Sequence, residues 1–144
     1  MIVENRRARH EYNILESLEA GLVLTGTEVK SVRAGGVSLS EAYARFRDGE
    51  AWLMGMHIPP YKQGSFSNSE PNRPRKLLLH REEIVRLQSR VGEKGLTVVP
   101  LRLYFTRGIA KVLLGVARGK KLWDKRADAA KRDVAREIAA HVRR

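Results

Sequence analysis

Residues 96–117 read LTVVPLRLYFTRGIAKVLLGVA, and this stretch predicts two adjacent strands. In its second half, alternate apolar residues share one face of a half-buried strand: Ala110, Val112, Leu114 and Val116. The first half, 96–105, is rich in Val, Leu and Tyr, and a short link containing Gly108 follows it. The sequence therefore predicts a hairpin between the two strands.

Further strands are expected on the N-terminal side of this hairpin. Asp48-Gly49 separates two apolar stretches, 42–46 and 51–58, and this dipeptide is typical of a tight hairpin turn. Pro59-Pro60 ends the second of these strands, and 11–24 is expected to form an opening strand that bends near Gly21. Several short antiparallel strands of this kind indicate a barrel or a sandwich. At this length an oligonucleotide-binding-type antiparallel β-barrel is the natural candidate for a mainly β protein.

Two helices are expected beside the strands, and the barrel type allows a third. Thr25 or Thr27 is a suitable cap for a helix over 28–34, which Gly35-Gly36 ends. A second helix over 81–91 carries apolar residues at helical spacing and is closed by Gly92. Residues 62–74 are expected to form a loop, and its length fits either a functional loop or a disordered one.

The charge of the chain points to a polyanionic partner. There are 28 Lys and Arg against 16 Asp and Glu, a net charge of +12, and such a surface attracts nucleic acid or an anionic membrane. No apolar run approaches the ~20 residues that a membrane span needs, and the first residues show no apolar signal segment. The absence of cysteine excludes disulfides. A cytoplasmic protein that binds RNA or DNA is therefore expected.

The C-terminal residues form a distinct segment. Residues 118–144 carry ten Lys and Arg against four acidic residues, a net charge of +6. Small and apolar residues recur there at helical spacing: Trp123, Ala127, Ala130, Val134, Ile138 and Val142. An isolated helix with so few large apolar residues is marginal in water. We therefore expect an RNA-binding β-barrel domain over 1–118 and a basic tail over 119–144 that is disordered when free and helical on a partner.

Basic residues cluster at three places, and the first two clusters have a simpler interpretation beside RNA binding. Near the N-terminus the candidates for phosphate contact or base stacking are Arg6, Arg7, Arg9 and His10. In the second cluster they are Arg75 and Lys76, and the third cluster, 118–126, interleaves cations with Trp123. The first could instead be a solvated arm and the second a strand with charged flanks.

The sequence shows no chemistry that would support catalysis. The four histidines lie far apart in the sequence, at His10, His57, His80 and His141, and there is neither an HExxH motif nor a neighbouring acid pair at metal-ligand spacing. No catalytic residue, metal site or cofactor is therefore expected, and the protein is not expected to be an enzyme.

Several motifs resemble those of one known family at the expected spacings. They include Asn5 to Tyr12, Glu19 to Gly35, Arg75 to His80, Gly95 to Leu101, Ala110 to Lys121 and Asp124 to Arg126. The chain resembles the SsrA-binding proteins, also called small protein B, over residues 4–126. The resemblance implies an oligonucleotide-binding-type barrel with a C-terminal tail that is disordered alone.

The function implied by this resemblance is trans-translation. The protein would bind the tRNA-like domain of transfer-messenger RNA (SsrA RNA) and deliver it to the vacant A site of a stalled ribosome. The barrel would stand where an anticodon arm stands, and the tail would become helical along the empty message channel of the small subunit. Elongation factor Tu would take part through the aminoacylated RNA, and the protein is expected to be monomeric.

The resemblance also implies roles for particular residues. The family's RNA-binding positions fall on Asn5, Glu19, Leu78 and Lys111, and His10 lies in a motif associated with the decoding centre. The tail positions needed on the ribosome fall on Arg118, Lys120, Lys121, Trp123, Asp124, Lys125 and Arg126. Gly36 departs from the family, which usually has Lys there, and Trp123 stands at a variable position. A ribosomal protein, a general single-strand binder and an RNA-processing enzyme are the competing interpretations of the composition.

Overall fold

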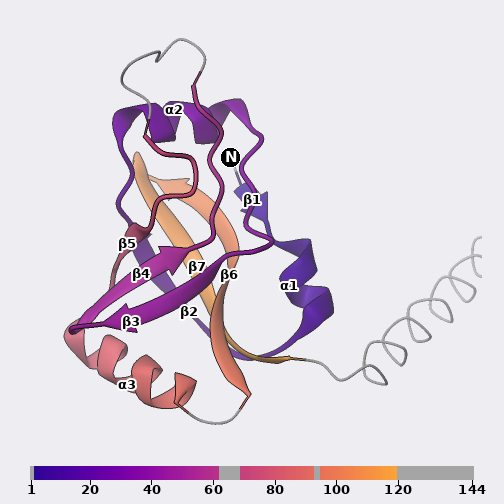
Figure 1. Cartoon of the computed structure of the whole chain (residues 1–144), viewed down its shortest axis with the longest axis vertical. Coiled ribbons are helices and arrows are strands. Elements are labelled where there is room, and N and C mark those ends of the chain that lie inside the picture. Colours follow the sequence, from indigo (N-terminus) through magenta and orange to yellow (C-terminus); the bar gives the residue numbers. More distant parts are fainter. Residues whose placement is uncertain (1, 62–68, 93–94, 120–144) are drawn as a thin grey trace, which may run out of the picture.

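The computed structural model describes residues 2–61, 69–92 and 95–119. These residues form one antiparallel sheet of seven strands, in the order β1-β6-β7-β2-β5-β4-β3, with three helices around it (Figure 1). The strands are β1 (Ile2–Glu4), β2 (Tyr12–Leu22), β3 (Tyr43–Arg47), β4 (Glu50–Met54), β5 (Arg75–Leu78), β6 (Leu96–Thr106) and β7 (Ile109–Gly119). The helices are α1 (Arg6–Glu11), α2 (Gly26–Ala34) and α3 (Arg81–Val91).

The sheet curves so far that its two ends approach each other. β3 is the last strand of the order, yet it lies beside β6, which is second from the other end (Figure 1). The inner faces of the strands therefore enclose a common core, which includes Leu53, Leu77, Val112, Leu114 and Val116. The mainly β, oligonucleotide-binding-type barrel that the sequence predicts is confirmed.

Both predicted hairpins are present, and both turns depend on left-handed backbone. Asp48 and Gly49 have φ of 53° and 75°, and Arg107 and Gly108 have 52° and 78°. Two successive residues with positive φ make the tight turn whose twist matches that of the flanking strands. β6 also contains Pro100, which cannot donate to a neighbouring strand, and the β6–β7 register shifts between Pro100 and Arg102.

β4 is shorter than the predicted strand over 51–58. It ends at Met54 because Gly55 has a φ of +74°, and a Cβ atom at that position would clash with the carbonyl oxygen of Glu41. The residues beyond it leave the sheet, apart from one isolated bridge between His57 and Ser38.

The helix predictions agree with the structure at α2 and α3, and Thr25 is the cap of α2. Its hydroxyl accepts from the N–H of Glu28, and the Glu28 carboxylate accepts from the N–H of Thr25. Helix α1 is not among the predicted helices, since residues 5–12 were interpreted only as a basic cluster, with a solvated arm as the alternative. It forms because the buried Asn5 side chain accepts from the N–H of Ala8, which anchors the first turn.

Candidate RNA interface

Cross-strand pairing brings four residues from different parts of the chain into one row. Leu78 of β5 pairs with Gly21 of β2, Gly21 pairs with Lys111 of β7, and Lys111 pairs with Tyr104 of β6. Their sequence neighbours Ala20, Leu77, Val112 and Leu103 are buried in the core. Because side chains alternate between the two faces of a sheet, this row lies on the outer surface of the barrel.

Glu19 lies on the same face, two residues before Gly21. The Tyr104 hydroxyl donates a hydrogen bond to the Glu19 carboxylate, and the Lys111 Nζ lies 3.7 Å from Glu19 Oε1. The side chain of Glu19 is 51% exposed, so its carboxylate is accessible to a ligand. Burial and the hydrogen bond to Glu19 raise the pKa of Tyr104 to about 12. The phenol therefore remains a donor at physiological pH and holds the carboxylate in place.

The apolar member of the row is unusually accessible. Leu78 is 53% exposed and packs over Gly21, where a Cβ atom would lie 3.1 Å from the Cβ of Leu78. A substitution at Gly21 would therefore displace Leu78. An exposed leucine beside a lysine and a carboxylate offers a nucleotide an apolar contact, a cation and an acceptor within one small area.

Sequence reasoning missed Tyr104 and its neighbours. Tyr104 lies beside an open hollow of about 500 Å³, which is lined by Ile2, Arg102, Tyr104, Phe105 and Leu113. Arg102 Nε lies 3.5 Å from Glu4 Oε1. The signal was available in principle, because the short 106–108 link fixes the hairpin register and sets Tyr104 opposite Lys111.

Two residues predicted to contact RNA are in the interior instead. Arg75 is completely buried; its Nε donates to Glu28 Oε2 at 2.8 Å and its Nη1 donates to the Met56 carbonyl at 2.6 Å. Asn5 is 3% exposed, and its amide donates to the carbonyl oxygens of Leu39 and Pro100. Neither side chain is accessible to RNA. Arg75 neutralises a buried acid, and Asn5 positions α1 against the barrel.

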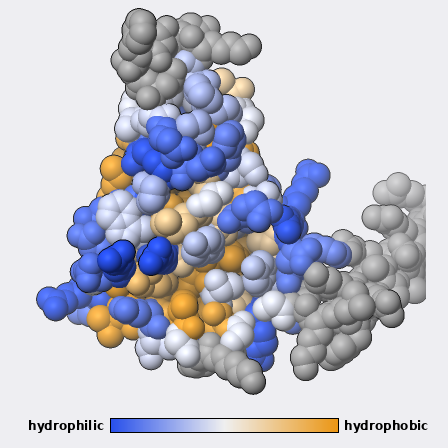
Figure 2. Space-filling view, viewed as in Figure 1, coloured by the Kyte–Doolittle hydropathy of each residue, from blue (hydrophilic) through white to orange (hydrophobic). Residues whose placement is uncertain are grey.

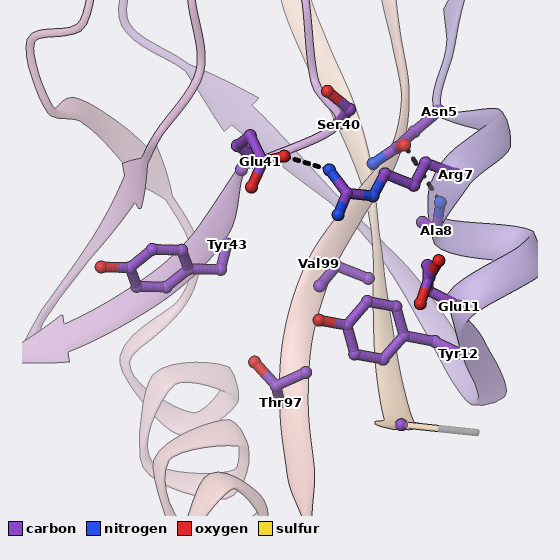
Figure 3. A pocket seen from close by; sticks show the side chains of 12 residues that line it. Asn5, Arg7, Ala8, Glu11, Tyr12, Ser40, Glu41, Tyr43, Thr97 and Val99 are labelled. Carbon is purple, nitrogen blue, oxygen red and sulfur yellow. Dashed lines mark hydrogen bonds and ion pairs between the residues drawn. The ribbon is translucent and has the colours of Figure 1, made fainter. Parts of the chain in front are cut away.

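The remaining N-terminal candidates form a second group at the other end of β2. Arg6, Arg9 and His10 are exposed on α1, while Arg7 forms an ion pair with Glu41 at the edge of a hollow of about 450 Å³ (Figure 3). Tyr12, which begins β2 next to α1, is seven residues from Glu19, roughly 23 Å along a strand. The structure thus unites Glu19, Leu78 and Lys111 and separates them from the α1 cations.

The other predicted residues divide between the barrel and the tail. Lys76 is on the outer face of β5, with its Nζ 3.6 Å from Glu50 Oε1, and Arg118 is exposed near the end of β7. The tail candidates lie outside the described residues: Lys120, Lys121, Trp123, Asp124, Lys125 and Arg126.

The described residues contain no group of three or more His, Cys, Asp or Glu side chains that could hold a metal ion. Among these same residues, no helix combines the length and apolar character needed to cross a membrane.

Comparison with known proteins identifies the family. The family model described as SmpB protein matches residues 2–144. A protein of Carboxydothermus hydrogenoformans named SsrA-binding protein is 57% identical over 143 residues, which are 99% of this chain and 96% of that one. A Salinispora tropica protein of the same name is 60% identical and covers 96% of this chain and 87% of its own length.

A solved structure described as "tmRNA-SmpB: a journey to the center of the bacterial ribosome" contains a similar chain. The two superpose with a TM-score of 0.72 and 59% sequence identity, over 84% of this chain and 85% of that one. Sequence and fold therefore agree, and the chain belongs to the SmpB protein family.

Proposed function

We propose that this protein binds the tRNA-like domain of transfer-messenger RNA and delivers it to the A site of stalled ribosomes for trans-translation. The row formed by Leu78, Lys111 and Tyr104, with Glu19 beside it, is the observation that carries the proposal. It offers the contacts that suit an unpaired, splayed RNA loop. The relatives' name, SsrA-binding protein, and the tmRNA-SmpB structure support the same RNA as the ligand.

The role of each group on this surface follows from its chemistry. Lys111 supplies a cation for a phosphate, and the Glu19 carboxylate accepts from an exocyclic amine of a base. Tyr104 is a positioning residue that fixes Glu19, while Leu78 packs against a sugar or a base. These are binding roles, and the protein acts without catalysis, metal or cofactor.

The same proposal assigns the ribosome to the other basic elements. The exposed α1 residues Arg6, Arg9 and His10 would contact the decoding centre of the small subunit, and 119–144 would form a helix along the message channel. Elongation factor Tu would be reached through the aminoacylated RNA. The protein works as a monomer in the cytoplasm, with 1–118 as the RNA-binding domain.

Recovery of the bound RNA tests the proposal directly. The tagged protein, purified from its own cells, should carry one abundant structured RNA, and sequencing should identify it as transfer-messenger RNA. A population of messages would indicate a general single-strand binder. Ribosomal RNA in equal amount to the protein would indicate a ribosomal protein.

Removing the Tyr104 hydroxyl should weaken RNA binding moderately. The Tyr104→Phe substitution keeps the ring but leaves Glu19 free to rotate, so the dissociation constant of the tRNA-like RNA should rise about fivefold, near 1 kcal/mol. Glu19→Gln should have a similar effect, and the double variant should be no weaker than the stronger single one, because both remove the same arrangement. Filter binding measures all three. Full additivity would show that Tyr104 acts independently of Glu19.

Removing the tail should separate RNA binding from ribosome rescue. A chain that ends after Gly119, the last residue of β7, retains the described barrel and loses 120–144. It should bind the tRNA-like RNA within about tenfold of the full chain, or ~1.4 kcal/mol, while tagging of stalled peptides is abolished. A thousandfold loss of RNA affinity would contradict this division between barrel and tail.

A further inference from the structure

A second row on the outer face of the barrel combines one indole with two cations. Arg45 of β3 pairs with Trp52 of β4, and Trp52 pairs with Lys76 of β5. The residues that alternate with them, such as Ala44 and Leu53, are buried in the core. The three side chains therefore project outward from adjacent strands, and the tryptophan is in the middle.

The two cationic side chains make few polar contacts with the rest of the protein. Arg45 is exposed and makes no hydrogen bond or ion pair with any residue in the described ranges. Lys76 is paired with Glu50 at 3.6 Å, but these side chains are 43% and 45% exposed. Such a surface pair contributes little to stability. Lys76 can therefore leave Glu50 and bind a phosphate with little loss in the free energy of unfolding.

The tryptophan is in an environment that leaves it available. Trp52 is partly exposed on the outer face of a strand whose inner residues, Ala51 and Leu53, are fully buried. Beside it on the same face, the exposed Tyr43 pairs with Met54. Figure 2 shows strongly hydrophilic side chains next to paler surface over β3 and β4. An accessible indole bordered by cations is a typical platform for an unpaired base.

This surface continues toward the row that contains Leu78. Lys76 and Leu78 are both on the outer face of β5, and the Lys76 carbonyl accepts from the N–H of Val23 at the end of β2. A strand of nucleic acid can therefore run from one row to the next without crossing an element. Proximity to a surface already suited to RNA favours RNA over a protein partner.

We propose that the Arg45–Trp52–Lys76 row is a second RNA contact, which takes an unpaired single-stranded segment. One base stacks on the Trp52 indole, and the flanking phosphates bind Arg45 and Lys76. The contact is independent of sequence, because every base has a stacking face. The contact is separate from the Glu19 and Lys111 site. The proposal would remain valid even if that site bound a different structured RNA.

The chain offers a selective optical probe for this contact. It has two tryptophans, Trp52 and Trp123, so full-length protein with Trp123→Phe reports on Trp52 alone. Titration with an unstructured oligoribonucleotide of about eight nucleotides, within the usual site size, should quench its fluorescence. In the same background, Trp52→Ala should weaken binding about tenfold by anisotropy of the labelled oligonucleotide, and Trp52→Phe should weaken it less. Circular dichroism confirms that each variant is folded.

A matched charge control distinguishes the contact from general attraction. Arg45→Gln and Arg107→Asn each remove one exposed cation, and asparagine tolerates the positive φ of Arg107. Only Arg45→Gln should lower the slope of log affinity against log salt, by about one unit. Lys111→Gln should keep the Trp52 quenching, which separates this proposal from the one above. The proposal would be overturned if the oligonucleotide did not quench Trp52 fluorescence at saturation, or if Trp52→Ala bound the oligonucleotide with unchanged affinity. It would also be overturned if the change in Trp52 fluorescence came from self-association of the protein.

Discussion

Glu28→Gln is expected to lower the free energy of unfolding by about 3–5 kcal/mol, the range found when one partner of a buried ion pair is removed. The Glu28 side chain is 3% exposed and accepts from Arg73 Nε at 3.0 Å and from Arg75 Nε at 2.8 Å. Without the carboxylate, the completely buried Arg75 guanidinium has no counter-charge. A loss of this size is a large part of the stability of a small domain. Urea unfolding followed by circular dichroism measures it.

The appropriate control restores an uncharged interior. Glu28→Gln with Arg75→Met removes the buried charges together, and the double variant should recover most of the lost stability. Arg73 is 29% exposed, so its guanidinium group can be hydrated in that variant. If the double variant were as unstable as Glu28→Gln alone, the unpaired charge of Arg75 would not be the cause of the loss. The α2 cap is present in both variants, because the amide oxygen of Gln can also accept from the N–H of Thr25.

The same site predicts how stability depends on acid. Burial by itself raises the pKa of Glu28, but the hydrogen bonds from Arg73, Thr25 and Arg75 outweigh it and hold the pKa below the ordinary value of 4.5. The stabilising contribution is therefore complete above that ordinary value. It is lost as the pH falls through the lower folded-state pKa. Glu28→Gln should flatten this part of the stability profile.

Lys111→Glu is expected to weaken binding of the tRNA-like RNA about a hundredfold. The substitution removes one charged contact, worth about 1.5–3 kcal/mol, and sets a carboxylate beside Glu19, where Lys111 now lies at 3.7 Å. The fold should tolerate the change, because Lys111 and Glu19 are 29% and 51% exposed and a surface pair contributes 0–1 kcal/mol. Filter binding and urea unfolding should separate the two effects.

Arg86→Glu is a close control for this experiment. Arg86 is likewise paired with a glutamate of β2, with its Nη1 3.0 Å from Glu16 Oε1, and the substitution changes the net charge by the same amount. It should reduce RNA affinity only through the weaker overall field, by a few-fold. Equal losses in the two variants would show that net charge, and not the surface around Glu19, determines binding.

Local patterns in the sequence predicted most of the fold. The alternation in 96–117, the Asp48-Gly49 turn and the Thr25 cap are each decided by residues a few positions apart, so they could be identified without the structure. Helix α1 and strand β1 have only six and three residues, too short for a periodic signal, and they depend on contacts with β6.

The candidate site was predicted less completely, for a related reason. Arg75 was grouped with Lys76 as a basic pair, although adjacent strand residues face opposite sides, and Arg75 shares the inner face with Leu77. Its partner Glu28 is 47 positions away, a separation that no local pattern reveals. The role of Tyr104 could not be predicted for the same reason, because its hydrogen-bond partner Glu19 is 85 positions away. The roles of Glu19, Leu78 and Lys111 in RNA binding remain predictions.

The pairing of β2 with β7 has a consequence for folding. β2 ends at Leu22 and β7 at Gly119, so the two longest ladders can form only after almost the whole barrel has been synthesised. The β6–β7 hairpin is local and closes first, whereas joining β2 to it closes a loop of about a hundred residues at a substantial entropic cost. Such high contact order predicts slow folding. Any nascent chain that ends before β7 lacks the β2–β7 ladder and leaves β2 with only its short pairing to β5, so the barrel stays open until β7 has been made.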